Sequence, residues 1–448
     1  MTPVTILGGG PAGLAVAFYA ARAGVPFALY ERAPTFGGLC RTFACGEHRY
    51  DSGAHRFHDR DPAVTADVRS LLGEALRPVA APSQIFDRGR FVDFPPTPLG
   101  LLRSTGIREA GRIGVEILAA RLRRRAAPRS FAEFAEHQFG ASLARRYLLG
   151  YSEKLWGLPA DRLSPEVATR RLQGMTVTSL LAEVFRPDGK TRHIDGDFLY
   201  PQGGYGAIAD ALTRALPGEA LHATTGIEAL ECVDARVRRL VAGGRTIEVP
   251  GRVVSTLPLT RLVRLLEANL PAPAVAAAAK LRFRDVRLVF LRLARDAVSP
   301  NASIYIPDPG LAVSRLSEPR NRCPTMAPAG ETSLVAEVPC SPGEPTHRSS
   351  DGALARRVVD EVASLGLLRP ADVVEWRHHL LRHAYPVYSI DYGDHVDRVL
   401  GGLAGIGNLD LVGRGGRFFY SHLHDQMRAA RDCVAAWPRH VTSAPRAS

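Results

Sequence analysis

The feature that most constrains the fold is a glycine-rich turn near the N-terminus, set between a short apolar run and a stretch of small residues. Residues 4–7 predict a buried strand, Gly8, Gly10 and Gly13 follow, and Glu31 ends a second apolar run. Gly8 permits a tight turn, Gly10 lets the backbone approach a pyrophosphate, and Gly13 lets a helix pack on the strand. The pyrophosphate is expected at the positive end of that helix. Glu31 would accept hydrogen bonds from a ribose, so the spacing predicts a dinucleotide-binding βαβ unit.

A second glycine pair and an arginine follow this acid almost at once, at Gly37, Gly38 and Arg41. A nicotinamide dehydrogenase would normally continue from the acid into another helix. The stretch from Glu31 to Thr42 instead resembles the flavoprotein superfamily of monoamine oxidases, protoporphyrinogen oxidases and UDP-galactopyranose mutases. In that superfamily the glycines pass close to FAD and the arginine lies near its phosphates. The resemblance therefore implies FAD as the cofactor.

The resemblance also implies which residues contact the cofactor and how it is held. Cys40 suggests a covalent flavin link, but the attachment cysteine of amine oxidases lies in their C-terminal flavin segment, so non-covalent FAD is expected. The expected cofactor-binding residues are Gly8, Gly10, Pro11, Ala12, Gly13, Glu31, Arg32, Gly37, Gly38, Leu39, Arg41, Gly53, Ala54, His55, Thr256, Gly413 and Arg414.

Further motifs narrow the resemblance to two branches of the superfamily. Residues 200–206 are typical of the protoporphyrinogen-oxidase-like branch, whereas 53–58, 151–157 and 384–388 are similar to the mutase branch. Tyr420, six residues after an arginine, also resembles the mutases, but His422 stands where they carry an acid. The flexible arginine loop of the mutases has no clear match in this chain.

Five residues are candidates for catalysis: His55, Lys154, Tyr385, Arg414 and Tyr420. The resemblance places His55 beneath the flavin, where an ordinary pKa near 6.5 would suit a base; the alternative is a structural histidine. Lys154 would hold a water above the flavin or form a surface ion pair. The tyrosines would contact substrate phosphates or be buried aromatics. Arg414 would neutralise charge on the reduced flavin or contact phosphate.

Two functional classes follow from these motifs. The first is an FAD-dependent oxidoreductase that transfers hydride from an amine- or hydroxyl-bearing carbon to flavin N5. Its substrate would be small and polar, in the class of sugars or nucleotide sugars, because Arg56, Arg414, Tyr385 and Tyr420 predict a cationic, hydroxyl-rich pocket. The alternative is a non-redox sugar mutase of the UDP-galactopyranose type that uses reduced FAD. Trp156 is either core or a substrate platform.

Length and pattern indicate an α/β chain, α+β overall, with two lobes. At 448 residues the chain exceeds the roughly 250–300 residues at which single cores stop growing. A Rossmann-type FAD-binding lobe is expected from 1–95, 196–275 and 396–448. A substrate-binding lobe of mixed sheet and helices is expected from 96–195 and 276–395. Residues 99–185 read as helical and 280–385 as rich in strands.

Residues 101–129 predict a basic amphipathic helix with eight arginines and two glutamates. A solvated face is the plainest explanation, and attraction of an anionic substrate or weak contact with a membrane surface are the others. No nucleic-acid-binding pattern accompanies it. The N-terminus lacks the pattern of a signal peptide and no apolar run predicts a membrane span, so a cytoplasmic protein is expected. The six cysteines have no metal-ligand spacing, and no metal is expected.

Overall fold

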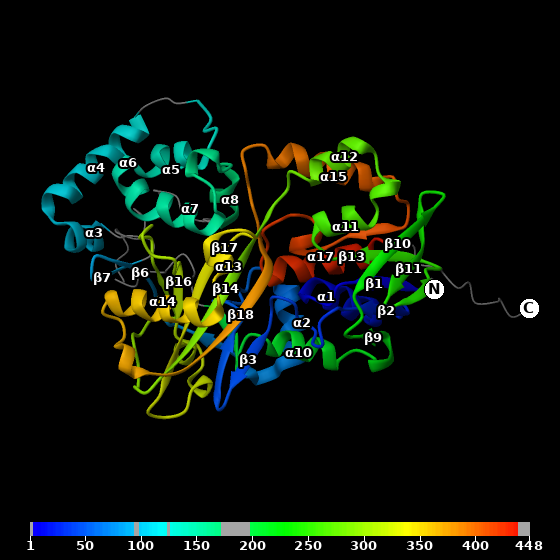
Figure 1. Cartoon of the computed structure of the whole chain (residues 1–448), viewed down its shortest axis with the longest axis horizontal. Coiled ribbons are helices and arrows are strands. Elements are labelled where there is room, and N and C mark those ends of the chain that lie inside the picture. Colours follow the sequence, from blue (N-terminus) through cyan, green and yellow to red (C-terminus); the bar gives the residue numbers. More distant parts are fainter. Residues whose placement is uncertain (1–2, 94–97, 123–125, 172–197, 438–448) are drawn as a thin grey trace, which may run out of the picture.

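The computed structural model describes residues 3–93, 98–122, 126–171 and 198–437. Their arrangement has three parts (Figure 1): a parallel sheet near the N-terminus, a larger mixed sheet, and a group of helices at the upper left. The chain passes repeatedly between the sheets, so residues far apart in sequence meet at their junction.

The parallel sheet carries the glycine turn and has the order β19-β13-β1-β2-β9. Its strands are β1 Val4–Leu7, β2 Phe27–Tyr30, β9 Leu221–His222, β13 Arg252–Ser255 and β19 Leu409–Leu411. Helices α1 (Pro11–Arg22) and α17 (Leu423–Ala435) pack against one another and against β1, which is buried along its whole length. A parallel strand covered on its faces needs continuous apolar residues, which residues 4–7 supply. The strands come from all three segments expected to form the cofactor lobe.

The mixed sheet has seven strands in the order β18-β14-β17-β16-β15-β6-β7. Their bounds are β6 Ser83–Asp87, β7 Arg90–Asp93, β14 Phe283–Leu293, β15 Ser303–Tyr305, β16 Arg315–Ser317, β17 Thr332–Cys340 and β18 Val373–Pro386. Helix α14 (Asp351–Ser364) covers one face through Leu354, Val358 and Val362. The strand-rich prediction for 280–385 agrees with this sheet. The expected lobe boundary at residue 95 is too late, because β6 pairs in parallel with β15 and β7 pairs with β6.

The helical part consists of α3 Pro98–Thr105, α4 Ile107–Leu122, α5 Phe131–Phe139, α6 Ala141–Leu143, α7 Gly150–Trp156 and α8 Glu166–Arg171. The single helix expected over 101–129 is instead two helices. Gly106, with φ +81°, ends α3, and this left-handed conformation strains any residue with a side chain. Residues 123–125 and 172–197 of the expected helical region lie outside the described residues.

The remaining longer elements are the strands of three smaller sheets and several further helices. They are β3 Thr42–Cys45, β4 His48–Asp51, α2 Pro62–Leu72, β5 Leu76–Val79, β8 Phe198–Pro201, α10 Ala207–Arg214, β10 Ile227–Val233, β11 Arg236–Ala242, β12 Arg245–Glu248, α11 Leu259–Leu265, α12 Ala272–Ala278 and α15 Tyr392–Ala404. No helix within the described ranges is long and apolar enough to cross a membrane.

Candidate active site

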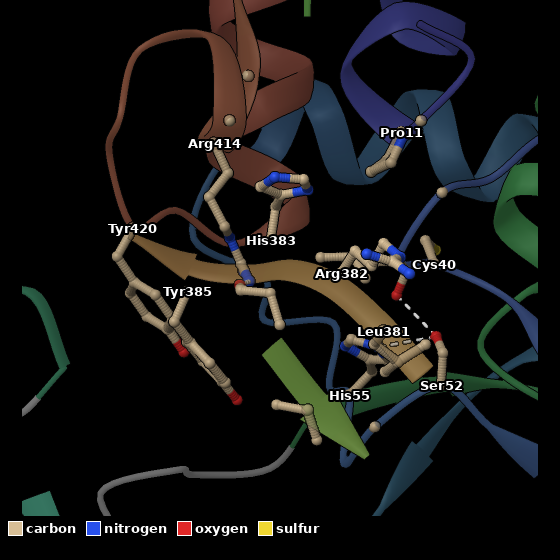
Figure 2. A pocket seen from close by; sticks show the side chains of 18 of the residues that line it. Pro11, Cys40, Ser52, His55, Leu381, Arg382, His383, Tyr385, Arg414 and Tyr420 are labelled. Carbon is tan, nitrogen blue, oxygen red and sulfur yellow. Dashed lines mark hydrogen bonds between the residues drawn. The ribbon is translucent and has the colours of Figure 1, made fainter. Parts of the chain in front are cut away.

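A cavity of about 720 Å³ lies where the two sheets and the helices meet. One end is lined by Gly8 and Gly10 of the parallel sheet, and the other by Tyr151 from the helices with Tyr305 and Arg315 from the mixed sheet. Figure 2 shows part of this lining, with Pro11 on one side and the Tyr385 and Tyr420 rings on the other. The volume falls within the roughly 300–1,000 Å³ of typical small-molecule sites.

The glycine turn between β1 and α1 packs too closely for side chains. Gly8 has φ +100°, and a Cβ on Gly13 would lie 1.9 Å from the Gly8 carbonyl oxygen. The second glycine pair reaches the same place, since a Cβ on Gly38 would lie 2.9 Å from the Gly10 Cα. The backbone at the N-terminus of α1 is therefore left bare toward the cavity, where it can meet a pyrophosphate.

Glu31 lies at the same end of the cavity and is fixed by the backbone. Its carboxylate oxygens accept hydrogen bonds from the Gly9 and Ala33 amides, both at 2.8 Å. An ionised carboxylate has about four lone-pair sites, so capacity remains for a ribose hydroxyl. Arg41 also lines this region, and its buried Nε has no hydrogen-bond partner among the described residues. Glu31 can bind the ribose of an adenosine diphosphate moiety, while the N-terminus of α1 and the Arg41 guanidinium can bind its phosphates. These groups therefore fit FAD.

Most of the expected cofactor-binding residues lie in the wall of the cavity. All of them line the cavity except Gly13 and Gly37. Gly13 packs beneath the turn, and the Gly37 amide donates a 2.8 Å hydrogen bond to the Gly9 carbonyl. These two glycines shape the cofactor loop without facing the space it encloses.

His55 lies in the cavity, but its ionisation differs from the sequence expectation. Burial, reinforced by the positive charges of Arg414, Arg315 and Arg322, lowers the pKa of His55 to about 3. The ring stacks on Tyr205 with centroids 5.0 Å apart, and Nε2 lies 3.4 Å from Ser52 Oγ. The expected pKa near 6.5 is therefore wrong for the protein without substrate, because the imidazole is desolvated among cations and stays neutral.

Tyr385, Arg414 and Tyr420 come together at the substrate end. The two tyrosine rings stack with centroids 5.9 Å apart, side by side in Figure 2. The Arg414 guanidinium lies 4.7 Å from the Tyr420 ring centroid and donates hydrogen bonds to the carbonyls of Ser421 and Ala384. These backbone bonds hold the cation in place beside the two phenols.

A buried ion pair at the same end was not expected from the sequence. Arg315 Nη2 lies 2.6 Å from Glu337 Oε2, and Glu337 also accepts a 3.0 Å hydrogen bond from the Ala54 amide. Arg56 lies nearby on the cavity wall, where burial lowers its pKa to about 10. The only signal in the sequence is that Glu337 is a charged residue inside an apolar strand. Its partner Arg315 lies 22 residues away, and the two meet only because β16 pairs with β17.

Lys154 does not take the role expected for it. Its Nζ donates 3.0 Å hydrogen bonds to the carbonyls of Ile306 and Val313, and it is absent from the cavity lining. Lys154 therefore joins α7 to the mixed sheet. Trp156 is 1% exposed and stacks on Tyr388 at 5.4 Å, which favours its core role, although its ring also meets Tyr385 and Tyr420 edge-on.

The titratable groups of this region give the cavity a positive potential. Burial, with neighbouring cations, lowers the pKa of His58 to about 3 and that of His422 to about 4, so both imidazoles are neutral. Arg56 and Arg414 line the substrate end, and the third arginine there, Arg315, forms an ion pair with Glu337. The cavity is thus suited to an anionic ligand.

The family described as flavin containing amine oxidoreductase matches residues 11–431. The chain is similar to a reduced UDP-galactopyranose mutase, with a TM-score of 0.84, 21% identity, and 97% of this chain and 95% of that one covered.

Two oxidases share the fold at lower identity. A redesigned putrescine oxidase superposes with a TM-score of 0.67 and 16% identity, covering 97% of this chain and 98% of that one. Cyclohexylamine oxidase from Brevibacterium oxydans superposes with a TM-score of 0.70 and 14% identity, with the same coverage. At these identities the structures establish a common fold, and the choice of reaction depends on the cavity.

Proposed function

This chain belongs to the family of flavin containing amine oxidoreductases, and from that premise we propose that it oxidises a small anionic, hydroxyl-rich molecule. The protein is an FAD-dependent enzyme of the amine oxidase superfamily. Bound FAD supplies two-electron oxidation by accepting hydride at N5. The proposed substrate class is sugar phosphates and nucleotide sugars, oxidised at a carbon that bears a hydroxyl or amine.

The observation that carries this proposal is the make-up of the substrate end. Arg56 and Arg414 line it together with Tyr385 and Tyr420, whereas the charges of Arg315 and Glu337 offset each other in their ion pair. A phosphate or carboxylate would gain charge-assisted hydrogen bonds from guanidinium groups here. A protonated diamine would meet like charges in a desolvated space, which is unfavourable.

The chain's own residues can position such a substrate and take a proton from it. Tyr385 and Tyr420 present adjacent phenols, and His55 supplies a neutral imidazole. The positive charges of Arg414 and Arg315 help to hold the pKa of His55 down, after burial. A bound anion would offset those charges and raise that pKa, so His55 would become a better base when substrate is present.

A second candidate is the non-redox mutase that uses reduced FAD. The observation that favours it is that the three histidines of the cavity are weak bases. The pKa values of His55, His58 and His422 are about 3, 3 and 4. Nucleophilic attack on an anomeric carbon requires less of a protein base than oxidation of an alcohol does.

The two candidates are separated by using the flavin absorbance as a reporter under anaerobic conditions. The oxidised holoenzyme should be bleached in one turnover by a sugar phosphate or nucleotide sugar, and much less by the neutral parent sugar. Bleaching by putrescine or another amine, but by none of the anions, would overturn the substrate class. Isomerisation only after dithionite reduction, without bleaching by any compound, would replace the oxidoreductase with the mutase.

A further inference from the structure

Helix α4 (Ile107–Leu122) has a second apolar stripe that faces solvent instead of the core. Ile107, Val115, Leu118 and Leu122 are 79%, 68%, 59% and 77% exposed, respectively. At 3.6 residues per turn these four positions fall within about 80° of one another around the helix axis. They form a continuous strip along nearly the full length of α4, here called the α4 stripe.

The inner face of α4 accounts for its attachment to the rest of the protein. Ile113 is 1% exposed and packs in the core with Phe139 and Leu143, and Glu116 accepts hydrogen bonds from the Ser142 amide and hydroxyl at 2.7 and 2.8 Å. The α4 stripe is therefore not needed to dock this helix. Gly111 and Gly114 lie in the same sector as the stripe, and nothing stands within 4 Å of a Cβ built on either.

The segment that carries the stripe is rich in arginine. Over 101–129 the sequence has eight arginines against two glutamates, and among the described residues Arg112 pairs with Glu109 and Arg129 with Glu133. Both glutamates are occupied, since Glu109 pairs with Arg112 at 2.7 Å and Glu116 binds Ser142. Arg108 is exposed on α4 next to Ile107, and Arg103 is exposed on the preceding helix α3. An exposed apolar stripe bordered by arginines is the pattern of a helix that lies in a lipid interface.

We propose that the α4 stripe docks this enzyme on the surface of an anionic phospholipid bilayer. The apolar side chains would enter the boundary between headgroups and acyl chains, about 5–10 Å deep, while the arginines contact lipid phosphates. The proposal stands on α4 alone and is independent of the reaction in the cavity.

Charge complementarity favours this occupant over two others. A second copy of the chain, which would use the same patch on both subunits, would cover the aliphatic side chains but would bring no free acid to the arginines, since Glu109 and Glu116 already have partners. A nucleic acid would satisfy the arginines but would leave four exposed aliphatic side chains without contacts. An anionic bilayer satisfies both features at once.

The test is cosedimentation of the full-length holoenzyme with vesicles of phosphatidylcholine, with and without phosphatidylglycerol. Binding should require phosphatidylglycerol and weaken as salt is added. The double variant Leu118→Ser/Leu122→Ser should lose tenfold or more in affinity, roughly as expected for two exposed leucines that no longer enter the bilayer. Val374→Ser is the matched control, because Val374 is 54% exposed on β18, away from α4.

The arginines are tested separately. Arg108→Gln should weaken binding about fivefold, the equivalent of about 1 kcal/mol per arginine at an anionic surface. Arg238→Gln, at an exposed position on β11 (Arg236–Ala242), should have no effect. Brominated lipids in anionic vesicles should quench the fluorescence of the tryptophan introduced by Leu118→Trp. They should not quench the fluorescence of the tryptophan introduced by Val374→Trp.

Several results would overturn the proposal. One is absence of binding to phosphatidylglycerol vesicles, and another is equal binding by the leucine variant. Light scattering that shows a dimer abolished by Leu118→Ser/Leu122→Ser would assign the stripe to a second copy. Nucleic-acid binding that depends on Arg108 but not on the leucines, without vesicle binding, would assign the arginines to that partner. A Leu118→Trp residue shielded from aqueous quenchers without lipid would mean that the chain itself covers the stripe.

Discussion

The ionisation of His55 shows how the residues around one side chain set its chemistry. Burial and the charges of Arg414, Arg315 and Arg322 all disfavour the imidazolium form, so the free enzyme holds a neutral ring at ordinary pH. A neutral ring can accept a proton at the start of a reaction, and once protonated it can return that proton in a later step. In the free enzyme His55 is therefore a base or a hydrogen-bond partner, not an acid.

For His55 we expect no ionisation in the kcat/KM profile between about pH 5 and 8, the range in which an ordinary histidine titrates. The reason is that its pKa of about 3 keeps the ring neutral throughout. His55→Ala should lower the rate by about 10²–10⁴ if the ring accepts a proton, with FAD still bound. Steady-state kinetics and flavin absorbance measure both quantities. An inflection near pH 6.5 in the native enzyme that His55→Ala removes would contradict the lowered pKa.

Glu31 is the residue whose change should act most directly on the cofactor. Glu31→Ala removes the acceptor expected for the ribose and also frees the amides of Gly9 and Ala33. Loss of charge-assisted hydrogen bonds of about 1.5–3 kcal/mol should weaken FAD binding roughly ten- to a hundredfold. Fluorescence titration of the apoprotein with FAD measures the affinity. Glu47→Ala, at an exposed acid that does not line the cavity, is the matched control, and an unchanged Kd in Glu31→Ala would refute the assignment.

At the scale of single elements, helix α2 (Pro62–Leu72) depends on one side chain at its start. Asp61 accepts 3.1 Å hydrogen bonds from the Ala63 and Val64 amides and also pairs with Arg428 of α17 at 2.6 Å. The Arg428 bond, with the Val64 amide and Arg431, lowers the pKa of Asp61 to about 2. One carboxylate therefore caps α2 and ties it to the C-terminal helix.

We expect Asp61→Ala to lower the free energy of unfolding by about 0.5–2 kcal/mol through the lost cap, plus a smaller amount through the lost ion pair. Asp61→Asn keeps a good capping side chain and loses only the charge, so it should be destabilised less. Urea unfolding of both variants at neutral pH measures the difference. Equal destabilisation of the two would mean that the ion pair, and not the cap, supports α2.

Helices and strands whose signals lie in adjacent residues could be predicted from the sequence. The residues at which they end, and the elements against which they pack, often could not. The β1 strand, the turn at Gly8 and helix α1 follow from adjacent residues, and the structure contains all three. The break between α3 and α4 at Gly106 was missed because the apolar spacing continues across it, and a single glycine in a helical pattern is often tolerated.

At the scale of the whole molecule, contacts between segments that are distant in the chain could not be predicted from the sequence. The parallel pairing of β6 with β15 joins residues more than 200 positions apart, for example Ser83 and Ser303, and no local pattern encodes it. No local pattern encodes the ion pair of Arg315 with Glu337 either, nor the position of the arginines that surround His55. Residue types at the dinucleotide turn could be read from spacing, but the electrostatics of the substrate end required the assembled sheets.

Four buried or half-buried histidines give the whole molecule a characteristic response to acid. The pKa values of His55 and His58 are lowered to about 3, and those of His379 and His422 to about 4, with burial as the leading cause in each. An unfolded histidine titrates near 6.5. Their contribution to stability is therefore complete above about pH 6.5 and is lost as the pH falls toward the folded values, because the unfolded state then binds more protons.

We accordingly expect the free energy of unfolding to fall as the pH drops from about 6.5 to 4, with an upper limit of about 1.4 kcal/mol per pH unit for a single histidine. Carboxylates with pKa values lowered to about 2, such as Asp61 and Glu331, add their losses only below about pH 4. His58→Gln removes one histidine that is 8% exposed, so its pH slope in the upper window should be shallower than that of the native protein. Urea unfolding of both proteins at a series of pH values measures the slopes, and the offset at pH 8 records any packing cost of the substitution. Parallel curves across the upper window would show that folding does not lower the pKa of His58, which would contradict a neutral His58 beside the cavity.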